Sequence, residues 1–451
     1  MALLPADWYE LSYSSTGGIS RVFVINSVKQ RRGVDGARGR NLWRTRVAGG
    51  LGKTGAKPET IDHVNLPTSP TPADSRVLPA AHPLQSGRTS ASPLVTTYQG
   101  TRGPVTPVWM MRQAGRSLPE YRALRVGTDM LDACLDPAMA SEITLQPVRR
   151  HGVDAGIFFS DIVVPIKLAG VDVSIVAGKG PVLPHPVRTA DDVRNLPTLD
   201  EAALAPISEA VALTVDALGD IPLIGFAGAP FTLAAYLVEG GPSKDHIAAR
   251  TMMHSDPESW QALMRWTATV TGAFLRAQIL AGASAAQLFD SWAGALSLAD
   301  YTAKVAPASA LALARVHGLE YTAPDAASRT VPIVHFGVGT GELLGAMHDV
   351  GADVMGVDYR IPLDEASRRL GGTVPLQGNI DPAFLAAPWP VLEAHVLDVL
   401  ERGKAAPAHV LNLGHGVPPD TDPAVITRLV AFVHQVAADA ASSLPAPTPA
   451  A

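Results

Sequence analysis

Two arginines four residues apart carry the strongest chemical signal in this sequence. Arg112 and Arg116 follow an apolar run of strand type at 107–111 and flank the loop Gln113-Ala114-Gly115. A guanidinium keeps its charge at any cellular pH and grips a carboxylate with two parallel hydrogen bonds. At the tip of a strand, such a pair is placed to hold an acidic ligand. The pattern favours a polycarboxylate ligand; the alternative is an exposed loop that pairs with the protein's own surface acids.

Four further residues have side chains suited to binding or catalysis. Asp161 follows an apolar run at 157–159, so its carboxylate is expected at an apolar rim, where charge interactions are strong. It could accept several N–H donors or stabilise a cation there, or it could cap the following helix, a contact worth about 1 kcal/mol. His415 lies between two glycines, which allow a ligand to approach closely. Tyr236 and Ser291 are hydroxyl donors that also fit ordinary core or capping roles.

Several catalytic patterns are absent. The sequence has no His-x-His after an early strand, no His-Glu-x-x-His and no Gly-x-Ser-x-Gly. This excludes amidohydrolase-like metal sites, zincins and the nucleophile elbow, and no metal site is predicted. The glycines at 337–341 could cradle a phosphate, but no Lys-Ser/Thr follows, and the ribose-binding acid could only be Asp358. Another anion, or a tight turn, is the preferred interpretation of this loop.

Composition predicts a globular protein of the cytoplasm. The 451 residues are 47% hydrophobic and 17% charged, enough for a large core. The single cysteine, Cys134, excludes an internal disulfide framework and a multi-thiolate metal site, which fits a reducing compartment. No window reaches the roughly 18 apolar residues of a membrane span. The first residues lack the basic start and apolar segment of a secretory signal, so no membrane partner is expected.

Charge and composition change near residue 90. Residues 1–90 carry 12 Lys and Arg against 6 Asp and Glu, a balance of +6, and residues 91–451 carry 24 against 36, or −12, which together give the net −6. From about 31 to 92 the chain is rich in Gly, Pro, Ser, Thr, Arg and Ala without periodicity, which predicts disorder. Nucleic-acid binding or targeting is the alternative to a dispensable extension or a start assigned too far upstream. No nucleic-acid partner is expected, and residues 442–451 form a Pro/Ala tail.

Eight β-rich runs, each followed by a helical pattern, fill residues 91–441. The strands are expected at 107–111, 155–159, 222–226, 285–289, 331–336, 353–357, 373–377 and 409–413. The helices are expected at 136–150, 201–218, 257–281, 299–316, 341–350, 363–370, 390–402 and 423–440. Asp-Pro pairs at Asp136, Asp256 and Asp422 mark three helix starts.

This alternation predicts an α/β fold, a (β/α)8 TIM-type barrel, with an open doubly wound sheet as the alternative. The alternating run at 171–187 predicts an inserted β-hairpin. Active sites of such barrels lie at the carboxyl ends of the strands. The polar residues that follow the predicted strands should therefore meet at one mouth; among them are Arg112, Arg116, Asp161, Ser291, Asp358 and His415.

Six motifs, in order, resemble the uroporphyrinogen decarboxylase family over about residues 92–441. They are PVWMMRQAGRSLPEYRALR at 107–125, FFSDIVVP at 158–165, GFAGAPFTLAAYLVEGG at 225–241, LFDSWAG at 288–294, QGNIDP at 377–382 and LNLGHGVPPDTDP at 411–423. The RQAGR loop and the LGHG segment are specific in combination. Residues 1–90 fall outside the pattern.

The resemblance implies an enzyme of haem biosynthesis. Members of the family remove the four acetate carboxyls of uroporphyrinogen III as CO2, giving coproporphyrinogen III, without metal or organic cofactor, and they pair as homodimers. Arg112, Arg116 and Arg125 would hold carboxylates of the tetrapyrrole. Asp161 would accept the four pyrrole N–H groups and stabilise the cation formed when a ring carbon is protonated.

The resemblance also assigns the remaining site residues. Gln113, Ala114 and Gly115 would belong to the substrate-binding loop. Contacts to substrate carboxylates and the apolar floor are implied for Tyr236, Ser291, His415, Phe226 and Phe289. The proton donor stays open between Arg112 and a bound water, because arginine is a poor acid.

Two other functions were weighed against this one. A corrinoid-linked methyltransferase of the same superfamily would use a zinc site with Cys and His ligands, but Cys134 has no partner thiol. A non-catalytic tetrapyrrole carrier would be expected to lose Asp161 or the arginine pair, and all three residues are present.

Overall fold

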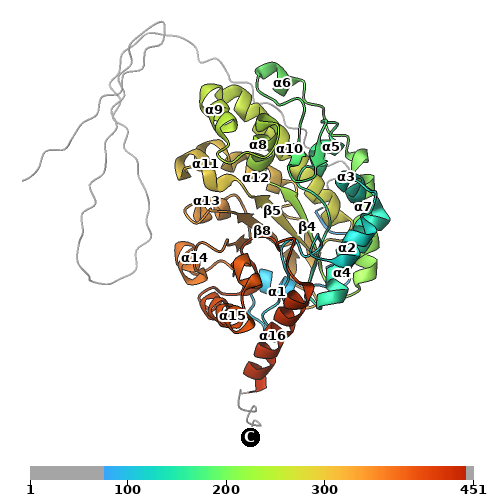
Figure 1. Ribbon diagram of the computed structural model, residues 1–451, viewed down its shortest axis with the longest axis vertical. Helices are drawn as coiled ribbons and strands as arrows, with labels where there is room; N and C mark the ends of the chain where they lie inside the picture. Colours follow the sequence, from blue (N-terminus) through green and yellow to red (C-terminus); the bar gives the residue numbers. More distant parts are fainter. Residues whose placement is uncertain (1–75, 443–451) are drawn as a thin grey trace, which may run out of the picture. The chain divides into compact units, whose positions relative to one another are not determined.

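A ring of helices surrounds a curled parallel sheet in the computed structural model, which describes residues 76–442 (Figure 1). Seven strands pair in the order β1-β4-β5-β8-β9-β10-β11, all parallel. They are β1 (Gly156–Ile157), β4 (Leu223–Gly228), β5 (Ala285–Asp290), β8 (Ile333–Gly337), β9 (Val354–Gly356), β10 (Leu376–Ile380) and β11 (His409–Leu413).

The chain at 107–111 occupies the eighth position and joins the two edges of the sheet. Val108 forms a parallel bridge with Leu411 of β11, where the Leu411 N–H donates to the Pro107 carbonyl at 2.9 Å. On the other side, the Asp154 N–H donates to the Val108 carbonyl at 2.9 Å, just before β1. The predicted (β/α)8 barrel is therefore confirmed, although this segment makes a single bridge rather than a regular strand.

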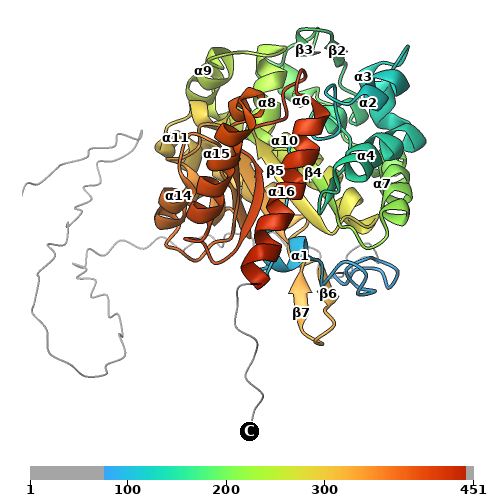
Figure 2. The ribbon, with the colours of Figure 1, turned by 60° about the horizontal axis from the view of Figure 1, so that its bottom comes forward.

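Helices cover the outside of the sheet, so its strands are buried on both faces, as in other parallel sheets (Figure 2). The helices are α1 (Pro93–Tyr98), α2 (Pro119–Leu124), α3 (Met130–Leu135), α4 (Pro137–His151), α5 (Val164–Leu168), α6 (Ala190–Arg194), α7 (Ala205–Leu218), α8 (Pro230–Glu239), α9 (Ile247–Ser255), α10 (Pro257–Leu280), α11 (Leu298–Lys304), α12 (Ala306–Ala314), α13 (Leu344–Asp349), α14 (Leu363–Arg369), α15 (Trp389–Gly403) and α16 (Pro423–Ser442), with short 3₁₀ helices η2 (Glu201–Leu204), η3 (Ala293–Ala295) and η4 (Pro382–Ala386). No helix of this part of the chain is long and apolar enough to span a bilayer.

The three Asp-Pro helix starts are confirmed. The carboxylates of Asp136, Asp256 and Asp422 accept N–H groups of the first turn at 2.9, 3.1 and 2.9 Å, respectively. Each contact satisfies a donor that the helix itself leaves without a partner. All eight predicted helices are present, but 299–316 is divided into α11 and α12 at Val305.

Local errors of the sequence prediction have physical causes. The inserted hairpin at 171–187 is present as β2 (Ser174–Val176) and β3 (Gly180–Val182). A second hairpin, β6 (Glu320–Thr322) and β7 (Ser328–Thr330), was missed because β7 is Ser-Arg-Thr and carries no apolar residue that could alternate with polar ones. It projects at the lower edge of Figure 2. Helix α8 was missed because eight of its ten residues are apolar and all but Glu239 are buried, which leaves no amphipathic pattern.

The stretch predicted to be disordered, from about 31 to 92, extends too far toward the C-terminus. Residues 76–92 are described and pack on the barrel: Leu84 is fully buried, and the ring Nε2 of His82 lies 2.9 Å from the Ile279 carbonyl. The hydroxyls of Thr89 and Ser284 are 2.8 Å apart. The composition did not predict this packing, because a segment that is polar on average can be anchored to the core by a few apolar residues such as Leu84. Residues 1–75 lie outside the described part of the chain.

This packing makes Leu84 a test of where the folded unit begins. Leu84→Ala should lower the free energy of unfolding by about 2–5 kcal/mol, measured in urea, because it leaves a cavity in the core. Val126→Ala is the control, since Val126 is 80% exposed. Deleting residues 1–87 should lower Tm more than deleting residues 1–75. Equal Tm values for the two truncated chains would contradict this packing.

Candidate active site

The loop that carries Arg112 is held by the side chain of Gln113. The Gln113 amide oxygen accepts the Met110 N–H at 2.9 Å, and its NH2 group donates to the Ala155 carbonyl at 3.1 Å. Arg112 itself has a φ of 60°, a left-handed conformation that costs a non-glycine residue of order 1 kcal/mol. The buried amide of Gln113 thus fixes the turn that aims Arg112.

The side chain of Arg112 lies over Gly416. A Cβ added at Gly416 would lie 2.8 Å from Cγ of Arg112 and closer still to its Cδ, so any larger residue there would force the Arg112 side chain to shift. The Val417 N–H donates to the Met111 carbonyl at 2.9 Å, which joins the loops that follow the 107–111 segment and β11. These contacts explain why the RQAGR loop and the LGHG segment occur together.

Asp161 is half-buried and lies four residues beyond Ile157, the last residue of β1. Burial raises the pKa of its carboxyl, whereas the N–H of Val163, at 3.0 Å, and the positive charge of Arg112 lower it. The contact to Val163 is a local turn ahead of α5, whose N-cap is Val163 without a side-chain cap, so Asp161 does not cap this helix. The carboxyl lies instead within electrostatic reach of the Arg112 cation. Burial strongly raises the pKa of the neighbouring Cys134 thiol, and the Asp161 charge raises it further, so this cysteine stays protonated at neutral pH.

An aromatic stack holds Tyr236. Its ring stacks on Trp292 with centroids 3.9 Å apart, and the ring of His246 stacks on the same indole at 4.3 Å. Burial raises the pKa of Tyr236 to about 12; the negative charge of Asp161 also raises it, whereas the positive charge of Arg112 lowers it. Tyr236 is therefore a neutral hydroxyl donor within the electrostatic reach of both residues.

His415 joins the same group from the end of β11. Burial lowers the pKa of its imidazole, and the charges of Arg112 and Arg360 lower it further, against the opposing effect of Asp358. Arg360 pairs with the buried Asp358 and stacks over Tyr359. Sequence reasoning missed Arg360 because it stopped at Asp358, the first polar residue after β9.

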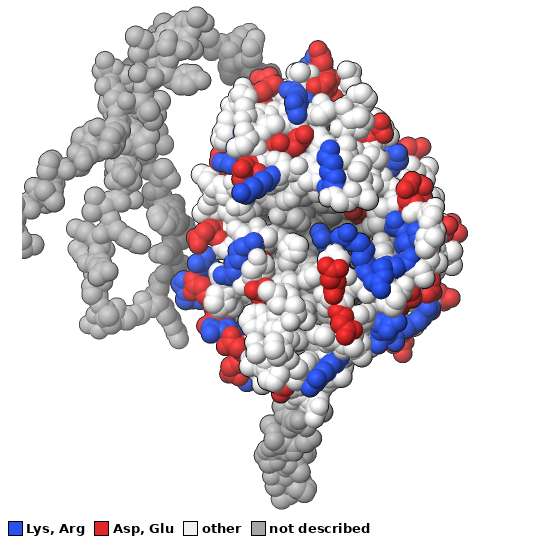
Figure 3. All heavy atoms as spheres, viewed as in Figure 1, with Lys and Arg blue, Asp and Glu red and all other residues white. Residues whose placement is uncertain are grey.

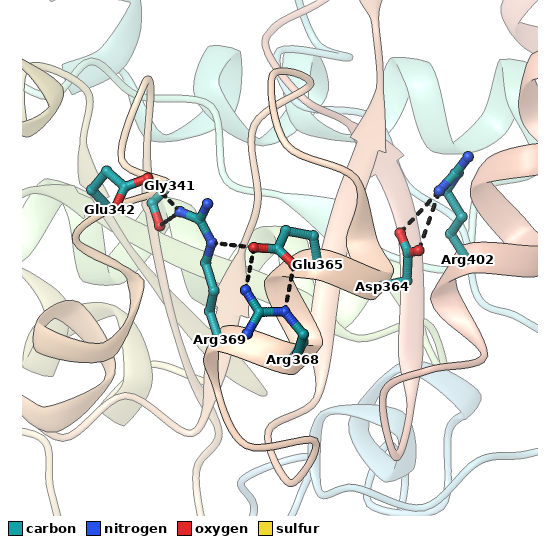
Figure 4. A network of polar contacts seen from close by, with 7 residues as sticks. All are labelled: Gly341, Glu342, Asp364, Glu365, Arg368, Arg369 and Arg402. Carbon is teal, nitrogen blue, oxygen red and sulfur yellow. Dashed lines mark hydrogen bonds and ion pairs between the residues drawn. The ribbon is translucent and has the colours of Figure 1, made fainter.

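The glycine-rich loop after β8 is tied down on both sides. The Gly339 N–H donates to the Asp358 carboxylate at 2.7 Å, and Arg369 donates to the Gly341 carbonyl at 2.9 Å. Figure 4 shows that Arg369 also joins a network with Glu365, Glu342 and Arg368, in which the arginines lower the pKa of Glu365 to about 2. These hydrogen bonds join the loop after β8 to Asp358 on one side and to Arg369 of α14 on the other.

Three aromatic rings from neighbouring strands of the barrel pack together. Phe226 of β4 and Phe289 of β5 meet edge to face at 5.4 Å, and Phe289 meets Phe336 of β8 at 5.9 Å. Ser291 follows β5, and it lines a hollow of about 510 Å³ together with Trp292. In Figure 3, the face of the molecule that is drawn has a hollow near its middle, with Lys and Arg side chains along part of its edge.

The structure thus places Arg112 within electrostatic reach of Asp161, Tyr236 and His415, and Asp161 also acts on Tyr236. Arg116 is exposed, and neither its guanidinium nor that of Arg112 has an ion-pair partner among residues 76–442. Arg125 instead packs against Tyr121, with Nη1 3.0 Å from the Met130 sulfur. Ala114 and Gly115 are half-buried in the loop. The alternative of surface acids pairing with the loop arginines is therefore not what this part of the chain shows.

Comparison with known proteins identifies the family. The model of the uroporphyrinogen decarboxylase (URO-D) family matches residues 89–436. This chain belongs to the uroporphyrinogen decarboxylase family. The uroporphyrinogen decarboxylase of Leifsonia xyli subsp. xyli (strain CTCB07) is 70% identical over 368 residues, covering 79% of this chain and 98% of that protein. That of Arthrobacter sp. (strain FB24) is 67% identical and covers 78% of this chain and 99% of that protein.

A solved structure supports the fold of this decarboxylase family member. A methyltransferase from Methanosarcina mazei superposes with a TM-score of 0.62 at 18% identity, covering 77% of this chain and 99% of that one. At this identity the likeness concerns the barrel alone. No group of three or more His, Cys, Asp or Glu side chains within residues 76–442 is placed to hold a metal ion.

The electrostatic coupling in the site can be measured on His415. The pKa of its imidazole should lie below 6.5 in histidine-labelled protein studied by NMR. Arg112→Met and Arg360→Met should each raise that pKa, because each removes a positive charge that opposes protonation. Arg149→Gln, which removes a surface arginine paired with Glu142, is the control and should leave it unchanged. An unshifted pKa of His415 in the Arg112→Met variant would show that the charge of Arg112 does not act on His415.

Proposed function

We propose that this chain decarboxylates the four acetate side chains of uroporphyrinogen III to give coproporphyrinogen III in haem biosynthesis. Family membership supports this reaction. The observation that carries the site assignment is the half-buried carboxyl of Asp161 within electrostatic reach of Arg112 and Tyr236. A buried anion with cationic and hydroxyl neighbours suits a substrate that carries both inward N–H groups and outer carboxylates.

The reaction needs a place for the electrons that the departing CO2 leaves behind. Protonation of a pyrrole carbon makes the ring cationic, so the C–C bond to the carboxyl can break with its electron pair drawn into the ring. CO2 leaves, and a second proton on the side-chain carbon, with return of the first from the ring, leaves a methyl group. The net change replaces one carboxylate and one proton with CO2 and a new C–H bond.

Asp161 stabilises the cationic ring in this proposal. Its carboxylate accepts the pyrrole N–H groups and lies beside the positive charge as it develops, in surroundings where water screens little. The Val163 N–H and Arg112 oppose the effect of burial on its pKa, which favours the ionised form that this role requires.

The side chains around Asp161 orient the substrate. Arg112 holds an acetate near the ring that reacts, while Tyr236, Ser291 and His415 contact other carboxylates. Phe226 and Phe289 lie beneath the macrocycle, where their apolar rings exclude water. Arg116, exposed on the same loop, binds a carboxylate at the rim. The proton on the ring carbon comes from a bound water or from Arg112.

The fold likeness to a methyltransferase does not favour that second activity. Zinc-dependent methyl transfer in this superfamily uses Cys and His ligands. Cys134, the one cysteine of the sequence, is buried, with a pKa raised far above its usual range. A thiol that resists ionisation is a poor metal ligand.

The resemblance further implies a homodimer in the cytoplasm, and we extend the proposal to both. Two chains of 47.1 kDa would give a particle of about 94 kDa. Light scattering at micromolar concentration would identify it, and a monomer there would contradict the dimer.

Loss of Asp161 should abolish most of the activity. Wild-type protein should turn over uroporphyrinogen anaerobically in the presence of EDTA, while Asp161→Asn should lower kcat by at least about 10²-fold, the effect expected for one electrostatic stabiliser. Product formation is measured by chromatography, with circular dichroism as the control for folding. Turnover near the wild-type rate in a folded Asp161→Asn protein would remove this residue from the mechanism.

The two loop arginines should differ in their kinetic effects. Arg116→Ala should raise KM more than it lowers kcat, because it removes a contact at the rim. Arg112→Ala should impair both, and it should move the acid limb of the pH profile to higher pH, since loss of the positive charge raises the pKa of Asp161. Unchanged kcat/KM in both variants would contradict the carboxylate-binding assignment.

A further inference from the structure

A hollow next to the site is lined by two basic side chains that the reaction described above does not use. It lies between the turn that joins α8 to α9 and the loop that follows β5, and it has a volume of about 510 Å³. Lys244 comes from this turn, Arg250 from the first turn of α9, and Ser291 and Trp292 from the loop after β5. Ser291 therefore belongs both to the proposed active site and to this hollow.

The two basic residues are not neutralised by neighbouring ion pairs. Neither Lys244 nor Arg250 forms an ion pair within the described part of the chain, whereas arginines of the network in Figure 4, such as Arg368 and Arg402, are paired with carboxylates. Asp245 is the one acid on the wall, so the hollow keeps a net positive charge. Two cations facing a polar hollow beside Ser291 suit an anionic group.

The wall that carries these cations is held in place. The His246 N–H donates to the Ser243 hydroxyl at 3.1 Å, and the Ala249 N–H donates to the Glu239 carboxylate at 3.0 Å. His246 stacks on Trp292 and is buried, yet its ring Nδ1 has no partner among the described residues. An unpartnered nitrogen at the wall is available to a ligand's oxygen or to a water that bridges to it.

The aromatic stack separates the hollow from Asp161. Trp292 stacks on Tyr236, whose pKa is raised by the charge of Asp161. Trp292 also stacks on His246, which lines the hollow. Two rings at about 4 Å cannot share one face of an indole, so they lie on opposite faces of Trp292. A carboxylate in the hollow is therefore kept away from the residue that stabilises the reacting ring.

We propose that this hollow is a subsite for a propionate of the substrate, bound by Lys244, Arg250 and the Ser291 hydroxyl. The inference rests on the proposed function and adds to its specificity. The four propionates stay on the macrocycle throughout the reaction, so a subsite apart from Asp161 serves every intermediate equally. It anchors the macrocycle away from the reacting group while each acetate in turn is held by Arg112.

Charge-removing variants test the subsite. Lys244→Met and Arg250→Gln should each raise KM about threefold, and the double variant about tenfold, with kcat within twofold of wild type, the scale of contacts between exposed charges. The same factors should apply to uroporphyrinogen and to the intermediate with five carboxylates that has lost three acetates. The effect should shrink at about 0.5 M salt, because these side chains are reached by solvent.

Controls separate this proposal from general effects of charge. Lys404→Met and Arg149→Gln remove cations paired with Glu401 and Glu142, away from the hollow, and should leave KM unchanged. Lys244→Arg and Arg250→Lys should restore KM to near the wild-type value. Wild-type KM in the double variant, or a rise confined to the eight-carboxylate substrate, would overturn the propionate subsite. Absence of turnover in the wild-type protein would instead overturn the proposed function.

Discussion

The site depends on the backbone hydrogen bonds of residues 107–111. This segment bonds to β11 on one side and to Asp154, ahead of β1, on the other, so it closes the barrel and ends at Arg112. Asp154 strengthens the closure: its carboxylate accepts the Val108 N–H at 2.7 Å and lies 3.0 Å from Nε2 of His434 on α16, a contact that raises the pKa of that histidine. A barrel opened at this seam would lose the position of Arg112, and with it the charge that faces Asp161.

The loop arginines differ from the paired arginines of the network around Glu365. Arg368 and Arg369 on α14 are paired with carboxylates, whereas Arg112 and Arg116 have no ion-pair partner in the described part of the chain. Keeping a cation unpaired beside a half-buried acid does not favour folding, because each would be better solvated in water. The arrangement is explained by a ligand that brings its own anions and N–H donors to the two sides of the site.

The features that were predictable from sequence depend on local patterns. The strands are continuous apolar runs, and the Asp-Pro pairs fix three helix starts, because both signals come from neighbours in the chain. The packing of Leu84 and the stacking of His246 on Trp292 could not be predicted, since each joins segments far apart in sequence. Arg360 was within reach, two residues beyond Asp358, but its influence on His415 depends on how β9 and β11 are placed in the sheet.

Some residues of the matched motifs supply functional side chains, whereas glycines in the same motifs let neighbouring loops and side chains pack closely. Gly416 is adjacent to His415 in sequence, and its lack of a side chain is what lets Arg112 pass. Gly294 plays the same part after β5: an added Cβ would lie 2.9 Å from the carbonyl group of Gly339 and closer still to that of Val338, so the glycine-rich loop can rest on it. That loop is also held by Asp358, which pairs with Arg360. The small residues therefore set how closely the loops pack, and this spacing places both Arg112 and Arg360 within electrostatic reach of His415.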